Sequence, residues 1–331
     1  MSEILSQPDP ETSFPSAPVS CTNDAPASAA VLIHPDTETL ITARNELLQR
    51  TLRPIPAEIP IESEYPIVLD PRHSDLSFCV TSVTGVSAHA NLWPRKVIDA
   101  SGSVIAHIGL IGNVATSEDV RGQGLMKQVM TQLSARALDQ GLSHLLLWSD
   151  LLSFYQKLGF ESLGSELRLT FGTQELEPLR HEHPVLPCQG AGLGPNDLAR
   201  MMARRLRLGP TLDRTASEFA KILEIPGALL FVGLDDEANY AIVGKGYDMG
   251  GVIHEWAASS PEVLLSMIAQ IGWVCDIVEI ILLAPSTLPE SWTEKLAPRA
   301  KISEKHPMAI AKRISDAPRL DDLFVWGLDA I

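Results

Sequence analysis

Blocks of hydrophobic and polar residues in the first half of the chain predict four successive elements. The apolar run over 104–115 is typical of a buried strand, and a polar turn follows it. Two glycines come next, in Arg121-Gly-Gln-Gly124. From Leu125 to about Leu138, apolar residues recur at helical spacing. A second apolar run, His144 to Trp148, predicts another strand. The predicted order is therefore strand, glycine loop, helix, strand.

The flanking sequence completes a first domain, which we place at residues 37–172. Residues 1–36 are rich in proline, serine and alanine. They have too little apolar surface to offset the entropy of ordering, so they predict a flexible tail. A helix is expected over 38–52, strands over 76–81 and 88–98, and a hairpin turn over 99–102. Leu167–Phe171 is the strand expected to close this domain.

The second half repeats this order of elements without the glycine loop. Residues 173–194, rich in Pro, Gly, His and Glu, predict a linker, and residues 195–331 a second domain. Helices are expected over 197–208, 217–223 and 261–272, and strands over 228–234, 240–245, 252–257 and 277–284. Ser259-Ser260-Pro261 takes the place of the glycines. The apolar ending, Leu323–Ile331, predicts a closing strand.

The glycine loop is suited to binding an anion. Main-chain N–H groups at a helix N-terminus lack intrahelical partners and carry partial positive charge. Gly122 and Gly124 remove the side chains that would keep a ligand away from the backbone, and Arg121 and Lys127 add formal charge. The loop therefore predicts a phosphate or pyrophosphate site.

These residues resemble the GNAT family of acetyl-CoA-dependent N-acetyltransferases. Arg121-Gly-Gln-Gly-Leu-Met126 is similar to that family's pyrophosphate loop except at Met126, and Phe154-Tyr155 followed by Leu158-Gly159-Phe160 is similar to its tyrosine helix and turn. The resemblance implies an α/β fold, α+β by segregation. It consists of a mixed, mostly antiparallel GNAT-type sheet flanked by helices, and we expect it twice, with a degenerate second copy that lacks the pyrophosphate loop.

The resemblance also implies which residues bind the co-substrate, acetyl-CoA. They are Asn113, Val114, Ala115, Arg121, Gly122, Gln123, Gly124, Leu125, Met126, Lys127 and Tyr155. A main-chain N–H of the splayed central strand, with Val114 the best candidate, would bind the thioester oxygen. An ordinary central strand is the alternative, but Gly109 and Gly112 within it are typical of a bulge or a close ligand approach.

Two proton transfers need candidate residues. By the resemblance, Tyr155 would protonate the CoA sulfur, as a phenol with a pKa near ~10 can do for a thiolate. Ile108 stands where some members of the family carry a catalytic glutamate. A water chain, Glu255 or the terminal carboxylate of Ile331 could act as the base instead.

Charge and composition exclude several classes of protein. The formal charge of -15 disfavours a nucleic-acid or anionic-membrane binder and suits an amine acceptor, either a small molecule or a peptide. The four cysteines are scattered, and no apolar run reaches the ~18 residues of a membrane span, so we expect a cytoplasmic protein, monomer or homodimer. His181-Glu-His183 lacks further ligands nearby, so no metal is expected.

Three features leave alternatives open. The arginines of one helix face could bind the CoA 3'-phosphate or be solvated: Arg200, Arg204, Arg205 and Arg207. Trp93, Trp256 and Trp326 could line an amine pocket or the core. For the whole protein, an N-acetyltransferase is preferred, and a non-catalytic protein that senses acyl-CoA or a metabolite is the alternative. A doubly wound nucleotide-binding enzyme is disfavoured because no acidic ribose ligand follows the glycines.

Overall fold

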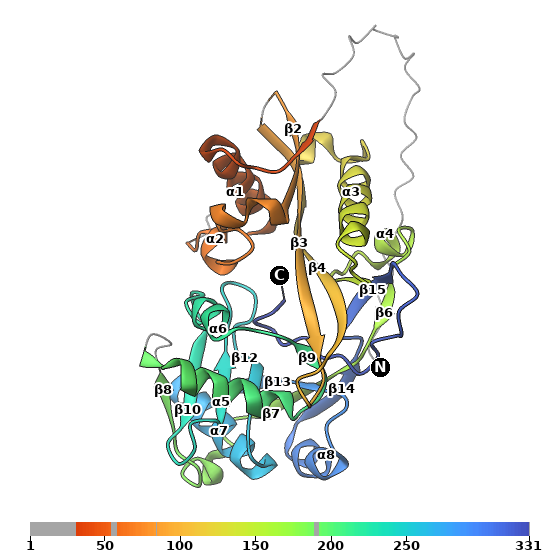
Figure 1. Cartoon of the computed structure of the whole chain (residues 1–331). Coiled ribbons are helices and arrows are strands. Elements are labelled where there is room, and N and C mark those ends of the chain that lie inside the picture. Colours follow the sequence, from red (N-terminus) through yellow and green to blue (C-terminus); the bar gives the residue numbers. More distant parts are fainter. Residues whose placement is uncertain (1–30, 54–57, 84, 189–191, 331) are drawn as a thin grey trace, which may run out of the picture.

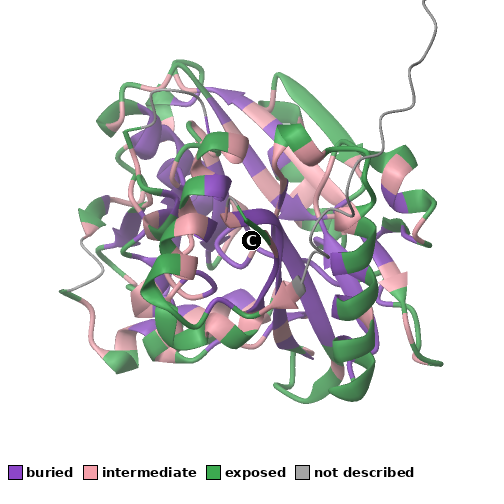
Figure 2. Cartoon of the chain, turned by 90° about the horizontal axis from the view of Figure 1, so that it is seen from above, coloured by how far each residue is buried: buried purple, intermediate pink, exposed green. Residues whose placement is uncertain are grey.

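The computed structural model describes residues 31–53, 58–83, 85–188 and 192–330, and within them the chain forms two sheets flanked by helices (Figure 1). Burial follows the sheets: the strands seen from above in Figure 2 are mostly buried, and the outer faces of the helices are exposed. No helix in these ranges combines the length and the apolar character that crossing a bilayer requires.

The first sheet holds the predicted strand–loop–helix unit. Its strand order is β1 (Val31–Ile33), β2 (Ser77–Ser82), β3 (Gly85–Ile98), β4 (Val104–Thr116), β5 (His144–Leu147), β15 (Ala309–Arg313) and β6 (Glu161–Leu163), with β9 (Thr211–Leu212) paired to β3. Only β4 and β5 are parallel among these pairs. Helices α1 (Glu38–Leu52) and α3 (Leu125–Asp139) lie on opposite faces of it (Figure 1).

The two helices form for local reasons and then bury one side each. The Thr37 hydroxyl accepts a hydrogen bond from the Leu40 N–H and begins α1, whose Leu47 and Leu48 are fully buried. In α3 the buried residues are Val129, Met130, Leu133 and Ala137, the helical stripe expected from the sequence. Both helices therefore hold the central strands β3 and β4 between two apolar layers.

The second sheet has the order β14 (Ile302–His306), β7 (Glu166–Gly172), β13 (Glu279–Pro285), β12 (Val252–Ala257), β11 (Tyr240–Val243), β10 (Leu229–Gly233) and β8 (Val185–Cys188). The remaining α-helices are α2 (Ile61–Glu64), α4 (Leu152–Gln156), α5 (Pro195–Leu206), α6 (Ala216–Ile222), α7 (Pro261–Val274) and α8 (Glu290–Leu296). Strands β12 and β13 are parallel, as β4 and β5 are in the first sheet.

The sheets exchange strands, which corrects one prediction. The strand at Leu167–Phe171 does not close the first sheet: it belongs to β7, between β13 and β14 of the second. The chain returns to the first sheet at β15, which pairs with β5 and β6. Apolar spacing identifies a buried strand but does not say which sheet edge receives it. A boundary at residue 172 therefore does not separate the sheets, and the predicted linker 173–194 contains β8, which pairs with β10.

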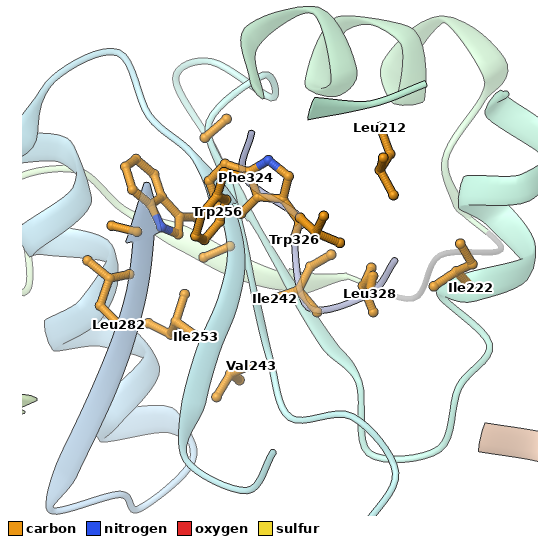
Figure 3. Close-up of a cluster of buried hydrophobic side chains, with 14 of the residues drawn as sticks. Leu212, Ile222, Ile242, Val243, Ile253, Trp256, Leu282, Phe324, Trp326 and Leu328 are labelled. Atoms are coloured by element: carbon orange, nitrogen blue, oxygen red, sulfur yellow. The ribbon is translucent and has the colours of Figure 1, made fainter. Parts of the chain in front are cut away.

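The two chain ends also differ from expectation. Of the predicted tail, residues 1–30 lie outside the described residues, and Val31–Ile33 forms β1 instead of a flexible segment. The segment from Leu323 to Ala330 is not a strand; it is irregular over residues 323–326 and forms a turn over residues 327–329. It is nonetheless buried, with Phe324 and Trp326 in the aromatic cluster of Figure 3. Its apolar residues are used for core packing instead of sheet pairing.

Candidate functional site

A cavity of about 950 Å³ opens where β4 and β5 part. The two strands pair from Ile108↔His144 to Leu110↔Leu146, and no further pair follows. Beyond that point residues 111–116 of β4 line one wall, and Leu147 to Ser149 line another. The separation of parallel neighbours leaves main-chain groups on this edge of β4 without a strand partner.

The wall formed by β4 contains a bulge. Three residues of β3, from His89 to Asn91, face four of β4, from Gly112 to Ala115, so β4 carries one extra residue. Asn113 in this bulge has φ 50°, a left-handed conformation that is costly for a residue with a Cβ. The predicted carbonyl-binding residues, Asn113, Val114 and Ala115, all line the cavity at this point.

The glycine loop forms the next wall. Gly122 and Gly124 both have φ 80°, and a Cβ at either would meet no atom within 4 Å, so both face open space. Gly124 is the N-cap of α3 and offers no side chain to its N–H groups. The following residues Leu125, Met126 and Lys127 line the cavity, as does Arg121, whose side chain is 55% exposed and 3.5 Å from Glu118. Of the predicted loop residues, Gln123 is not in the lining.

Tyr155 on α4 completes the site. The residue is 4% exposed, lines the cavity and lies in edge contact with Phe154 and Phe160, whose ring centroids are 5.0 and 5.6 Å away. Burial raises the pKa of the Tyr155 phenol to about 12. The group therefore keeps its proton at neutral pH.

A second cavity of about 680 Å³ adjoins the first and is lined by both sheets. Three residues line both cavities: Tyr65, Trp148 and Ser149. The walls of the second are mainly apolar, and its ionisable residues are Asp150, Glu166, Arg168, Lys245, Asp248 and His306. Burial raises the pKa of the Glu166 carboxyl even though Arg168 donates to it at 3.1 Å. Sequence reasoning missed this cavity because its residues come from distant parts of the chain.

A buried arginine lies where the two cavities meet. Arg53 donates to both carboxylate oxygens of Glu64, at 2.6 and 3.1 Å, and to the Tyr65 hydroxyl at 3.2 Å. It also binds Asp248, in the turn between β11 and β12, at 3.1 Å. The cluster fixes Tyr65 at the junction. A lone arginine before a proline carries no sequence signal of this role, so the prediction did not include it.

The structure rules out Glu255 as the base. Glu255 is fully buried and lines neither cavity. Arg214 binds both of its oxygens at 3.0 Å, and the Tyr240 hydroxyl donates to it at 2.9 Å. Burial alone would raise the pKa of Glu255, but Arg214 and then Arg205 outweigh burial and hold it below its usual range. The prediction is wrong because a sequence does not show that two arginines are folded onto this carboxylate.

The other candidate base, Ile331, lies outside the described residues. The residue before it, Ala330, lines the second cavity. The buried Lys245 ammonium donates to the carbonyls of Gly327, at 2.8 Å, and of Ala330. Burial lowers the pKa of Lys245 to about 8. This lysine anchors the end of the described chain beside the second cavity.

The structure places three of the four arginines of the helix face and the three tryptophans. Arg205 is buried in the ion cluster with Glu255 and Asp329, and Arg200 and Arg204 bind the nearby acids Glu237 and Asp236. The tryptophans are core residues, since Trp93, Trp256 and Trp326 are 6%, 0% and 1% exposed. Within residues 31–53, 58–83, 85–188 and 192–330, no group of three or more His, Cys, Asp or Glu side chains could hold a metal ion.

Comparison with known proteins agrees with this geometry. The family model for the acetyltransferase (GNAT) domain matches residues 85–162, which span β3, β4, the glycine loop, α3, β5 and α4. The search of curated proteins gave no match. The resemblance stated from the sequence is thus confirmed for this region, and it contains every predicted cofactor-binding residue.

Solved structures show the same fold over most of the chain. A GCN5-related N-acetyltransferase from Kribbella flavida matches with a TM-score of 0.64 and 18% identity, covering 86% of this chain and 72% of that one. A GCN5-related N-acetyltransferase from Anabaena variabilis gives 0.63 and 14%, covering 87% and 73%. A Pyrococcus horikoshii protein gives 0.59 and 14%, covering 94% and 99%. The mixed α/β GNAT fold is confirmed, and the match extends over both sheets.

Proposed function

We propose that the chain is an acetyl-CoA-dependent N-acetyltransferase that moves the acetyl group directly to a primary amine of a small molecule or peptide. One observation carries the proposal: uncapped helix donors, a bulged strand edge and a buried phenol line one cavity. These are the groups that a diphosphate, a thioester carbonyl and a leaving thiolate each need.

Each reacting or binding group of acetyl-CoA is assigned to residues that line the first cavity. The N–H groups after Gly124, with Arg121 and Lys127, bind the diphosphate of CoA. The Val114 N–H binds the thioester oxygen and stabilises the negative charge that grows there as the amine attacks the carbonyl carbon. The C–S bond then breaks with its electron pair on sulfur, and Tyr155 protonates the thiolate. The amine loses a proton to solvent and the Tyr155 phenolate regains one from solvent, so an amide and CoA thiol are the products.

The acceptor enters through the second cavity in this proposal. That cavity meets the first at Tyr65, Trp148 and Ser149, so an amine held in it reaches the thioester without passing the diphosphate loop. Carboxylates at Asp150, Glu166 and Asp248 favour a cationic amine on approach. Attack needs the neutral amine, so the rate should rise with pH through the acceptor's own pKa. We propose a cytoplasmic protein that acts without a metal, without nucleic acid and away from membranes.

Calorimetry with acetyl-CoA followed by a thiol-release assay over an amine panel tests the proposal. Binding of acetyl-CoA together with amine-dependent release of one thiol per amide is the expected result. Binding without release for any amine would instead favour a non-catalytic acyl-CoA sensor, for which the absence of a glutamate at Ile108 is the supporting observation. Lack of binding would overturn both functions.

A further inference from the structure

A buried histidine lies directly behind the bulge of β4. His89 on β3 is fully buried, and its Nδ1 is 2.8 Å from the carbonyl oxygen of Asn113. That carbonyl belongs to the residue with φ 50°, the conformation that sets the direction of the next peptide. Neither the family resemblance nor the proposed chemistry assigns any role to His89.

The tautomer of His89 follows from its partner. A carbonyl oxygen only accepts, so Nδ1 must carry the hydrogen. Burial lowers the pKa of the imidazole to about 3, which keeps the ring neutral at any ordinary assay pH. The proton on Nδ1 therefore leaves Nε2 bare, and no protein group in the described part of the chain hydrogen-bonds to it. His89 is a fixed, uncharged donor and not a general base.

Because the peptide is planar, the bond from His89 to the Asn113 carbonyl also fixes the direction of the Val114 N–H. In a trans peptide the carbonyl and the following N–H point to opposite sides. Because His89 holds the Asn113 carbonyl, the Val114 N–H must point away from His89. Val114 packs on the cluster of α3 and Tyr155, which also contains Ala88 and Ala90 of β3. His89 and Asn91 alternate with these two residues along the strand, so they face the opposite side of the sheet. We propose that His89 is a positioning residue, which holds the Asn113 peptide so that the Val114 N–H is directed at the thioester oxygen.

A second bond supports the same peptide from its side chain. The Asn113 amide donates to Asn91 Oδ1 at 3.1 Å, and Asn91 in turn donates to Ser77 Oγ and to the carbonyls of Val68 and Leu76. Asn91 thus ties the bulge to the loop before β2 and is itself fully buried. The two bonds together hold Asn113 in its left-handed conformation, which is strained and persists only because the surrounding structure fixes it.

The inference rests on the proposed acetyl transfer, and its test separates the two. Three variants differ in the donor that they place near Asn113: His89→Asn retains an N–H at about the Nδ1 position, His89→Gln moves it toward the Nε2 position, and His89→Leu has none. For each, kcat in thiol release, the Kd of acetyl-CoA and of CoA, and the Tm are measured. CoA lacks the acyl carbonyl, so its Kd reports only on the glycine loop and the rest of the carrier.

We expect His89→Leu to lower kcat by about 100-fold, the scale for loss of one carbonyl donor. The Kd of CoA should stay within a factor of about three, and His89→Asn should recover most of kcat while His89→Gln should not. If His89→Leu does not fold, the Asn and Gln variants decide. Equal kcat for these two, or a full kcat for His89→Leu, overturns the inference. An inactive wild type that binds CoA overturns the proposed function, and the ratio of acetyl-CoA to CoA affinity across the variants then tests His89 alone.

Discussion

The two sheets contain the same strand–helix–strand unit, but only the helix of the second sheet has a side-chain cap at its N-terminus. Helix α3 begins after Gly124, which is left-handed and caps nothing. Helix α7 begins after Ser260, whose hydroxyl accepts a hydrogen bond from the Val263 N–H at 3.3 Å, and Pro261 has no N–H to satisfy. One helix begins without a side-chain cap, and the other begins with a cap that accepts a hydrogen bond from one of its N–H groups.

The space between the parallel strands differs in the same way. Beyond the paired residues, β4 and β5 enclose the cavity of about 950 Å³. Between β12 and β13 the Trp256 indole donates to the Leu283 carbonyl at 2.8 Å, and Trp326 lies against Trp256 with ring centroids 5.7 Å apart (Figure 3). Both parallel pairs end after two or three residue pairs. The side chains beyond that point decide whether the space becomes a site or core.

The largest effect should come from breaking the buried ion cluster of Arg205, Arg214, Glu255 and Asp329 in the second half of the chain. Asp329→Asn leaves Arg205 and Arg214 facing one buried carboxylate instead of two. We expect the free energy of unfolding, measured in urea, to fall by about 3–5 kcal/mol. The exposed pair Asp321–Arg319 gives a control, since Asp321→Asn should change it by no more than about 0.5 kcal/mol. Equal effects of the two variants would contradict a structural role for the cluster.

The same cluster predicts a pH dependence. Burial would raise the pKa values of Asp329 and Glu255, but Arg214 and Arg205 hold both below their usual range. A depressed folded-state pKa stabilises the protein above the unfolded value, near pH ~4, and this stability is lost as the pH falls through the folded value. Asp329→Asn should therefore lose less stability on acidification than the wild type. A steeper acid slope in the variant would argue against this assignment.

Next in size, Gly124→Glu should close the open helix end. A carboxylate at the start of α3 competes for the diphosphate donors, and we expect the Kd of CoA in calorimetry to rise about 100-fold or more, or ~2.7 kcal/mol. Gly102→Glu is the matched control, because Gly102 has φ 81° and open space around its Cβ but lies in the hairpin after β3. Retained affinity in Gly124→Glu, or equal loss in both, would refute the loop assignment.

Tyr155→Phe should lower turnover without changing the binding of CoA. Loss of a general acid lowers the rate by about 100-fold, so kcat should fall by that factor while the Kd of CoA is unchanged. The exposed Tyr247 provides the control, and Tyr247→Phe should retain full activity. Wild-type kcat in Tyr155→Phe would remove the phenol from the mechanism.

The smallest effect should come from the closed helix end. Ser260→Ala removes the cap of α7 and should cost about 1 kcal/mol of unfolding free energy, with CoA affinity unchanged. A change in CoA affinity in this variant would show that the second unit also takes part in binding, and the contrast between the two helix ends would then fail.

The local units of this fold were predictable because they depend on neighbours in the sequence. Helix α1 begins and ends at the expected residues, 38 and 52, since its cap and apolar stripe are local. The glycine loop was predicted from the local order of strand, loop and helix, and Tyr155 from the family resemblance; both line the first cavity. The order of elements alone likewise showed that the second unit lacks the loop.

The tertiary structure alone decided which elements meet. An apolar pattern states that β7 is buried, but sheet membership depends on the edge that is free when the chain collapses, and β7 and β15 each joined the sheet of the other half. Glu255 is a candidate base when only the sequence is considered, and it becomes an ion-pair partner only when Arg205 and Arg214 fold onto it. His89 gains its position behind the bulge in the same way, because a one-residue shift between β3 and β4 is a property of the pairing and not of either strand.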